Sequence, residues 1–226
     1  MNILLIAGLW LDASAWDDVV GPLEARGHTV TPVRLPGVDD RDPSATLDDQ
    51  TDAVVAAVDA ADGPVWVVGH SAACTLAWLA ADRRPDRVAG VALVGGMPQV
   101  NGERYADFFP AADGVVPFPG WEPFDGPDAA DLDDDARQVF EARAVPVPEG
   151  VARGVVRLRD ERRYDVPVVM VCPEYSAEQA RAWVEGGEVP EVARATRVSY
   201  VDVDSGHWPM LTVPDELARV LDEAIR

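Results

Sequence analysis

The sequence predicts an α/β protein, a doubly wound domain built on a mostly parallel sheet of about six strands. Its length of 226 residues fits one domain with a sizeable insertion. Six short apolar runs alternate with helix-like segments along the chain. Each run is continuously apolar, which is typical of strands that helices cover on both faces.

The elements are expected in a regular order along the chain. Strands are predicted where Val, Ile and Leu gather, and helices in the segments between or after them. In chain order we expect strand 2–8, helix 15–26, strand 29–33, helix 47–61, strand 64–69, helix 72–84, strand 87–95, strand 166–172, helix 177–185, strand 196–203 and helix 214–225.

One segment, residues 97–165, interrupts this alternation. It is rich in proline and holds all five phenylalanines of the protein: Phe108, Phe109, Phe118, Phe124 and Phe140. A segment this long between two strands is typical of a functional lid or small cap. We therefore expect a single domain, residues 1–226, with a cap or lid insertion at residues 97–165.

The same insertion carries an acidic cluster between residues 125 and 135. A calcium loop beginning at Asp131 would need Gly at the position of Ala136 and Glu at the position of Ala142. The cluster therefore indicates a solvated acidic face and a helix N-terminus, and no metal site is expected.

Composition narrows the class of protein. The net charge is −21, from 40 acidic and 19 basic residues, and this charge disfavours nucleic-acid or membrane-surface partners. Only two cysteines occur, Cys74 and Cys172, so free thiols are expected. The apolar start, residues 3–9, lacks a basic flank and is interrupted by Asp12, so a cytoplasmic location is expected.

The strongest motif is Gly69-His70-Ser71-Ala72-Ala73, at the junction of an expected strand and an expected helix. A sharp turn there would hold Ser71 in a strained conformation with Oγ above the sheet, and small flanking residues would avoid clashes. This placement predicts a nucleophile. A helix-capping serine is the alternative interpretation.

A nucleophilic serine needs a base, and the chain has three histidines. His28 enters an early strand, and His70 is expected to pack away from Ser71. His207 follows the last expected strand, at the carboxyl edge of the sheet, where a loop could bring its Nε2 to the Ser71 hydroxyl. We therefore predict His207 as the general base.

The loop after the first strand ends at this same edge. The N–H of Leu9, or next that of Trp10, is expected to form an oxyanion hole together with the N–H of Ala72. Three indole side chains, Trp10, Trp121 and Trp208, are expected to line an apolar substrate pocket with the lid phenylalanines. The alternative is that these rings only pack the lid on the core.

These stretches resemble the α/β-hydrolase superfamily, most closely its small methylesterase and hydroxynitrile-lyase-like branch. The similarity rests on residues 5–10 with Trp16 and 22–28, on residues 68–71, and on residues 205–211 with 214–217. It implies the α/β-hydrolase fold, a Ser-acid-His triad in that chain order, and no cofactor. Ala7-Gly8 stands where the family usually has His-Gly, and Ala73 replaces a glycine.

The acid of the triad departs from the family pattern. The family places an Asp shortly after the strand 166–172, where this chain has Tyr175 or Ser176. Glu174 is the leading replacement, because its longer side chain could offset a shortened loop. Asp202 and Asp204 are the alternatives, and a Ser-His dyad without an acid also stays open.

The predicted function is a serine hydrolase that acts on a carboxylic ester or lactone of a small apolar or aromatic molecule through an acyl-enzyme. Non-hydrolytic alternatives stay open: a lyase using the same residues, or a receptor or scaffold that binds a hydrophobic metabolite. The expected partner is a small-molecule substrate, and assembly into a homo-oligomer is left open.

Overall fold

The computed structural model describes residues 1–226 and contains one six-stranded sheet in the order β2-β1-β3-β4-β7-β8. Every neighbouring pair of strands in this sheet is parallel, so the predicted fold class is confirmed. The strands are β1 (Asn2–Ile6), β2 (Thr29–Pro32), β3 (Val65–His70), β4 (Val88–Val94), β7 (Val168–Cys172) and β8 (Val198–Asp202).

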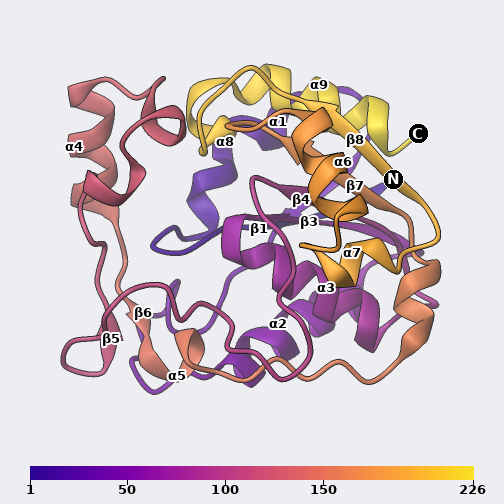
Figure 1. Cartoon of the computed structure of the whole chain (residues 1–226), viewed down its shortest axis with the longest axis horizontal. Coiled ribbons are helices and arrows are strands. Elements are labelled where there is room, and N and C mark those ends of the chain that lie inside the picture. Colours follow the sequence, from indigo (N-terminus) through magenta and orange to yellow (C-terminus); the bar gives the residue numbers. More distant parts are fainter.

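Helices cover both faces of this sheet (Figure 1). On one face α1 (Asp17–Ala25) packs with α9 (Pro214–Ala224), through Val19, Leu23, Leu217 and Leu221. The other face is covered by α2 (Leu47–Ala60), α3 (Cys74–Arg83) and α6 (Ala177–Glu185). Alternate residues of each central strand point to these two cores, as the pleat of a strand requires.

The two edge strands differ from the expectation of uniformly apolar, fully covered strands. All six residues of β3 are buried, whereas β2 buries only Val30 fully and β8 buries none of its five residues fully. Each edge strand has a neighbour on one side only, so part of its surface faces solvent.

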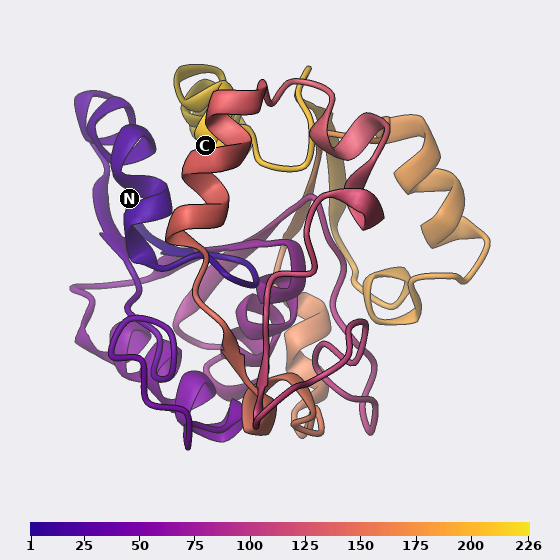
Figure 2. The same ribbon diagram turned by 90° about the vertical axis from the view of Figure 1, so that its left-hand side faces the viewer.

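The insertion lies between β4 and β7 and contains little regular structure. It holds α4 (Asp134–Arg143), α5 (Glu149–Ala152) and the short antiparallel pair of β5 (Val115–Val116) with β6 (Val147–Pro148), together with the 3-10 turns η3 (Glu122–Phe124), η4 (Pro127–Ala129) and η5 (Glu161–Asp165). Seen from the side in Figure 2, α4 stands in front of the sheet, at the edge where the strands end.

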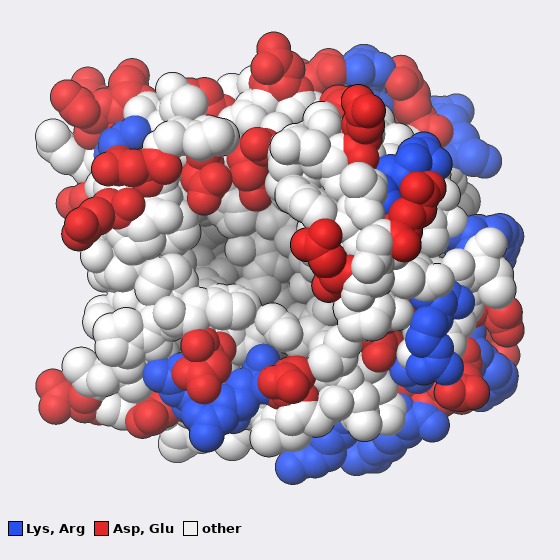
Figure 3. Space-filling model, in the orientation of Figure 1, with Lys and Arg blue, Asp and Glu red and all other residues white.

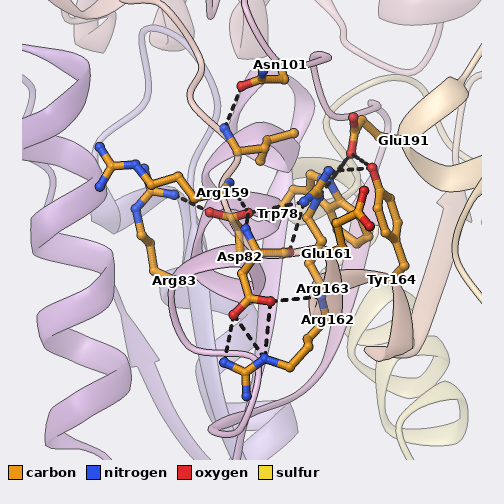
Figure 4. A network of polar contacts seen from close by, with 12 residues as sticks. Trp78, Asp82, Arg83, Asn101, Arg159, Glu161, Arg162, Arg163, Tyr164 and Glu191 are labelled. Atoms are coloured by element: carbon orange, nitrogen blue, oxygen red, sulfur yellow. Dashed lines mark hydrogen bonds and ion pairs between the residues drawn. The ribbon is translucent and has the colours of Figure 1, made fainter.

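A buried polar network connects the last part of the insertion, residues 159–164, to α3 (Figure 4). The Asp82 carboxylate, which is fully buried, accepts hydrogen bonds from the main-chain N–H groups of Arg159 and Asp160 at 2.7 and 2.9 Å. The Arg163 guanidinium lies between Asp82 and Glu191, at 3.3 and 3.1 Å. Because every buried charge in it is paired, this network can hold the insertion at a fixed place on the domain.

The remaining helices are short, namely α7 (Pro190–Ala193) and α8 (Pro209–Thr212). No helix has the length and apolar character that crossing a bilayer requires.

Both cysteines are free and buried, as expected. Burial raises the pKa of the Cys74 thiol, so this group stays protonated although it follows the Ser71 turn directly.

Candidate active site

Ser71 occupies the sharp turn between β3 and α3, at the start of the 3-10 turn η2 (Ser71–Ala73). Its φ of 55° lies in the left-handed region, which residues with a side chain rarely adopt. Two glycines make room for this turn. A Cβ on Gly69 would lie 2.3 Å from the Ala73 carbonyl oxygen, and a Cβ on Gly96 would lie 2.4 Å from the main-chain carbonyl oxygen of Ser71.

The structure brings Ser71, His207 and Glu174 together from three separate loops. The Nε2 atom of His207 lies 2.9 Å from Ser71 Oγ, and its Nδ1 atom lies 2.8 Å from Glu174 Oε1. Because a carboxylate only accepts, Nδ1 carries the ring proton, and in the neutral ring Nε2 then accepts from the Ser71 hydroxyl. This is the tautomer that a general base for the serine needs.

Glu174 reaches the histidine because the ends of β4 and β7 leave space beside it. Gly95 has a φ of 57°, and a Cβ there would lie 3.3 Å from both Glu174 Oε2 and His207 Nδ1. The other two acidic candidates lie elsewhere. The Asp202 carboxylate accepts the Ala177 N–H at 2.6 Å, and Asp204 is an exposed residue that makes no hydrogen bond to His207.

His70 is buried, as its expected packing role requires, but it also contacts the His207 loop, which that role did not include. It is 1% exposed, yet its Nε2 lies 2.7 Å from the main-chain oxygen of His207, to which it donates a hydrogen bond. Burial, and then the nearby His207, lower the pKa of His70 well below its usual 6.5. The ring is therefore neutral at pH 7 and joins the loop of His207 to the end of β3.

The loop after β1 passes directly beside the Ser71 turn. A Cβ on Gly8 would lie 2.8 Å from His70 Nδ1 and 3.0 Å from Ser71 Cβ, so a larger residue at this crossing would displace the buried His70 ring. The N–H groups of Leu9 and Trp10 donate to no acceptor in the protein. Ala72 follows Ser71 in the first turn of the helix, where N–H groups lack an intrahelical acceptor. The two segments that meet here, the loop after β1 and the Ser71 turn, therefore both carry N–H groups without an acceptor in the protein.

Trp10 is held between this loop and the insertion. Its φ of 64° is again left-handed, its indole N–H donates to the Val116 oxygen at 3.2 Å, and its carbonyl accepts from the Val145 N–H at 2.9 Å. The indole ring meets Phe109 and Phe118 edge-on, with centroids 5.2 and 5.3 Å apart. These contacts fix the free donors of the loop relative to the insertion.

An apolar cavity of about 180 Å³ opens at Ser71 and His207. Besides these two, its walls are Leu9, Trp10, His70, Phe108, Phe109, Phe124 and Trp208. None of these residues is Asp, Glu or Arg. In the orientation of Figure 1, the molecule is hollowed beside the start of α3, and the walls of this hollow are uncharged (Figure 3).

Trp121 does not line this cavity, contrary to expectation, whereas Trp10 and Trp208 do. Its ring packs behind the wall, against Trp208 and Phe140, with centroids 5.5 and 5.2 Å away. The cation of Arg137 lies over its other side, 5.3 Å from the ring centroid. Trp121 thus belongs to the layer that supports the cavity wall, because the lid phenylalanines occupy the wall itself.

A larger groove, of about 780 Å³, lies between the start of α1, α4 and α8. It contains neither Ser71 nor His207, and Trp10 is the one residue that it shares with the apolar cavity. The apolar cavity is therefore the one that Ser71 and His207 face. No group of three or more His, Cys, Asp or Glu side chains gathers in a way that could hold a metal ion.

Fold and geometry together define a doubly wound α/β protein with a Ser-His-carboxylate arrangement at the carboxyl edge of its sheet. A sequence model described as the alpha/beta hydrolase family matches residues 3–220. The chain therefore belongs to the alpha/beta hydrolase family, as the sequence motifs suggested. This membership supports an enzyme, and more specifically a hydrolase.

Solved structures with the same fold cover nearly the whole chain. An extracellular alpha/beta-hydrolase from a Paenibacillus species, described as sharing structural and functional homology with tobacco salicylic acid binding protein 2, is 19% identical with a TM-score of 0.80, over 99% of this chain and 98% of that one. A pyrethroid hydrolase from Sphingobium faniae JZ-2 is 20% identical, with a TM-score of 0.75 over 100% and 97% of the two chains.

The methylesterase MES16 from Arabidopsis is 16% identical, with a TM-score of 0.75 over 100% of this chain and 98% of that chain. This neighbour comes from the methylesterase-like branch that the sequence resembles. At these identities the likeness concerns the fold. No curated protein sequence matches the chain.

Proposed function

We propose that this protein is a serine hydrolase that cleaves a carboxylic ester or lactone of a small apolar or aromatic molecule through an acyl-enzyme. The observation that carries the proposal is the chain of contacts from Ser71 Oγ to His207 Nε2 at 2.9 Å and from His207 Nδ1 to Glu174 at 2.8 Å. Such a chain supplies both the nucleophile and the base that acyl transfer needs.

In the first half-reaction, Ser71 Oγ attacks the carbonyl carbon while its proton passes to His207 Nε2. The negative charge that develops on the carbonyl oxygen is stabilised by the N–H groups of Leu9 and Ala72. The imidazolium is stabilised by Glu174 through Nδ1–H, and it returns the proton to the departing alcohol oxygen. The C–O bond of the ester breaks, and the acyl group stays on Ser71.

In the second half-reaction, a water molecule takes the place of the alcohol. His207 removes one of its protons as the water oxygen attacks the acyl carbon. The second tetrahedral intermediate collapses, Ser71 Oγ regains the proton from His207, and the carboxylic acid is released. Together the two half-reactions convert an ester and water into a carboxylic acid and an alcohol, and neither half-reaction involves a metal or a redox group.

The walls of the cavity support the substrate class. Six of the nine lining residues are hydrophobic, and five of these carry aromatic rings: Trp10, Phe108, Phe109, Phe124 and Trp208. Burial of apolar surface against such walls favours uncharged apolar or aromatic substrates, because a charged group would lose hydration without gaining a partner. In this proposal, the insertion 97–165 acts as the cap that supplies the phenylalanines.

A serine-directed fluorophosphonate probe with intact-mass detection separates this proposal from a ligand-binding receptor. We expect one covalent adduct per chain, mapped to Ser71, and none in the Ser71→Ala variant. The Cys74→Ala variant is the matched control, since it changes the neighbouring buried residue and keeps the serine. Absence of an adduct on a folded wild-type protein would favour the receptor alternative.

A further inference from the structure

The loop that carries His207 is bonded to the insertion through its main chain. The Gly206 N–H donates to the Asp131 carboxylate at 2.8 Å, and the His207 N–H donates to the Asp128 carbonyl oxygen at 2.7 Å. Both acceptors belong to the acidic cluster of residues 125–135, which the sequence indicated to be a solvated face. The main-chain N–H groups of two successive residues, Gly206 and His207, therefore both donate hydrogen bonds to the insertion.

This contact is close as well as polar. A Cβ on Gly206 would lie 2.3 Å from Asp131 Oδ1 and 2.4 Å from the Asp128 carbonyl oxygen. Only a glycine therefore lets the histidine loop and the segment 128–131 approach each other this far. On the other side, the His207 carbonyl accepts the hydrogen bond from His70. The main chain of the base is thus held from the insertion and from β3 at once.

The bond from Gly206 ends on a side-chain carboxylate of an otherwise exposed residue, Asp131. Hydrogen bonds to carboxylate acceptors are in general stronger than those to neutral ones. The pKa of the Asp128 carboxyl is raised, chiefly because burial disfavours its charged form; His207 offsets this in part, and Glu174 adds to it. Neither aspartate lines the apolar cavity, so neither would touch the reacting atoms of a substrate there.

We infer that Asp131 is a positioning residue for His207. By accepting the Gly206 N–H, it docks the segment 128–131 on the histidine loop and keeps His207 Nε2 in line with Ser71. The proton transfers of the reaction would then be fast only while the insertion is docked. This inference rests on the proposed serine hydrolase function.

The test compares variants of the full chain in the hydrolysis of a neutral aryl ester. Asp131→Ala removes the acceptor, and we expect kcat to fall about tenfold with KM within about twofold, because misplacement of a catalytic group raises the barrier without changing substrate contacts. Asp131→Asn keeps an acceptor oxygen, and its kcat should recover to within about threefold of the wild type. Asp134→Ala is the matched control, as it removes the same charge from an exposed position without a hydrogen bond to the histidine loop.

A second readout does not depend on activity. Hydrogen exchange of the peptide spanning residues 204–208 should be faster in Asp131→Ala than in the wild type and in Asp134→Ala, because the Gly206 amide loses its acceptor. If Asp131→Ala does not fold, Asp131→Glu replaces it: the charge stays, the carboxylate is displaced, and the same changes in kcat and exchange are expected.

The outcomes separate the two claims. If the wild type hydrolyses the ester and Asp131→Ala equals Asp134→Ala in both kcat and exchange, the positioning role is overturned while the proposed function stands. If the wild type hydrolyses no ester, the proposed function fails, and with it the effect on kcat. A loss of kcat that Asp131→Asn does not restore would also contradict a role as hydrogen-bond acceptor.

Discussion

His70 donates a hydrogen bond from Nε2 to the main-chain carbonyl of His207, with the two imidazole rings 4.9 Å apart between centroids. The residue that precedes Ser71 therefore supports the main chain of the residue that Ser71 contacts, His207. Since the Nδ1 atom of His70 is buried without a partner, this one bond determines the tautomer of the ring. His70 is therefore expected to act as a positioning residue for the His207 loop.

Replacing His70 by Ala should lower both stability and turnover. The substitution removes a side chain that is 1% exposed and leaves the His207 carbonyl without this donor, so the free energy of unfolding in urea should fall by about 1–3 kcal/mol. We expect kcat to fall at least about tenfold with little change in KM, because the His207 loop loses one of its two attachments. The His28→Ala variant, which also loses a buried histidine but lies away from the site, should lose stability without a specific loss of kcat.

The depressed pKa of His70 predicts a pH dependence of stability. Its pKa is lower in the folded protein than the 6.5 of the unfolded chain, so between these two values the unfolded state binds more protons. The contribution is fully present above pH 6.5 and is lost as the pH falls below it, with a slope of at most about 1.4 kcal/mol per pH unit. Urea unfolding of the wild type and His70→Gln between pH 5 and 7 should differ by this slope, and equal slopes would contradict the account.

Glu174 should matter for rate far more than for stability. Its carboxylate holds the tautomer of His207 and stabilises the imidazolium, so Glu174→Gln should lower kcat by about 10²–10⁴-fold while the melting temperature changes little. Asp204→Asn removes a charge near His207 in sequence but without contact to it, and should have the smaller effect. If Asp204→Asn lowered kcat more than Glu174→Gln, the acid of the triad would be a residue other than Glu174. If neither substitution lowered kcat, a Ser71-His207 dyad without an acid would be favoured.

The aromatic cavity predicts the order of substrates. For one and the same alcohol, neutral esters of aromatic or medium-chain acids should give higher kcat/KM than acetates or than esters of charged acids. Phe108 lines the cavity and is 58% exposed, so Phe108→Ala should widen the mouth and raise kcat/KM for bulkier esters relative to small ones at little cost in stability. Val139→Ala, 53% exposed and outside the cavity, is the control, and an unchanged order of esters in Phe108→Ala would argue against a role of this ring.

The sequence was sufficient for those features that depend on local pattern. The strand-turn-helix context of Ser71 and the late His207 follow from runs of a few residues, and both β3 and α6 lie within a residue of their expected ranges. Three other strands, β1, β7 and β8, are each two residues shorter at one end than expected. The burial of β8 was predicted less well, because a run of apolar residues does not reveal whether its strand lies at an edge of the sheet.

Features of the site that depend on contacts distant in sequence were missed. Asp131 and Gly206 are 75 residues apart, and nothing in the pattern of an acidic cluster distinguishes the one carboxylate that meets a backbone amide. Trp121 was placed in the cavity wall because aromatic residues of a lid all look alike in sequence, whereas its contacts put it behind Trp208. One usable signal was the glycine before His207, since a glycine in a site loop often marks a close backbone approach.

The decisive measurement is the capture of an acyl-enzyme on Ser71. The protein is mixed with a slowly deacylated aryl ester, quenched in acid and analysed by intact mass and peptide mapping, in parallel with Ser71→Ala and with steady-state turnover. We expect the added mass of one acyl group on the peptide that contains Ser71, and a loss of about 10³-fold or more in turnover for Ser71→Ala. Ester hydrolysis that continues at near wild-type rate in Ser71→Ala, or turnover with no acyl group on Ser71, would contradict the proposed acyl-enzyme mechanism.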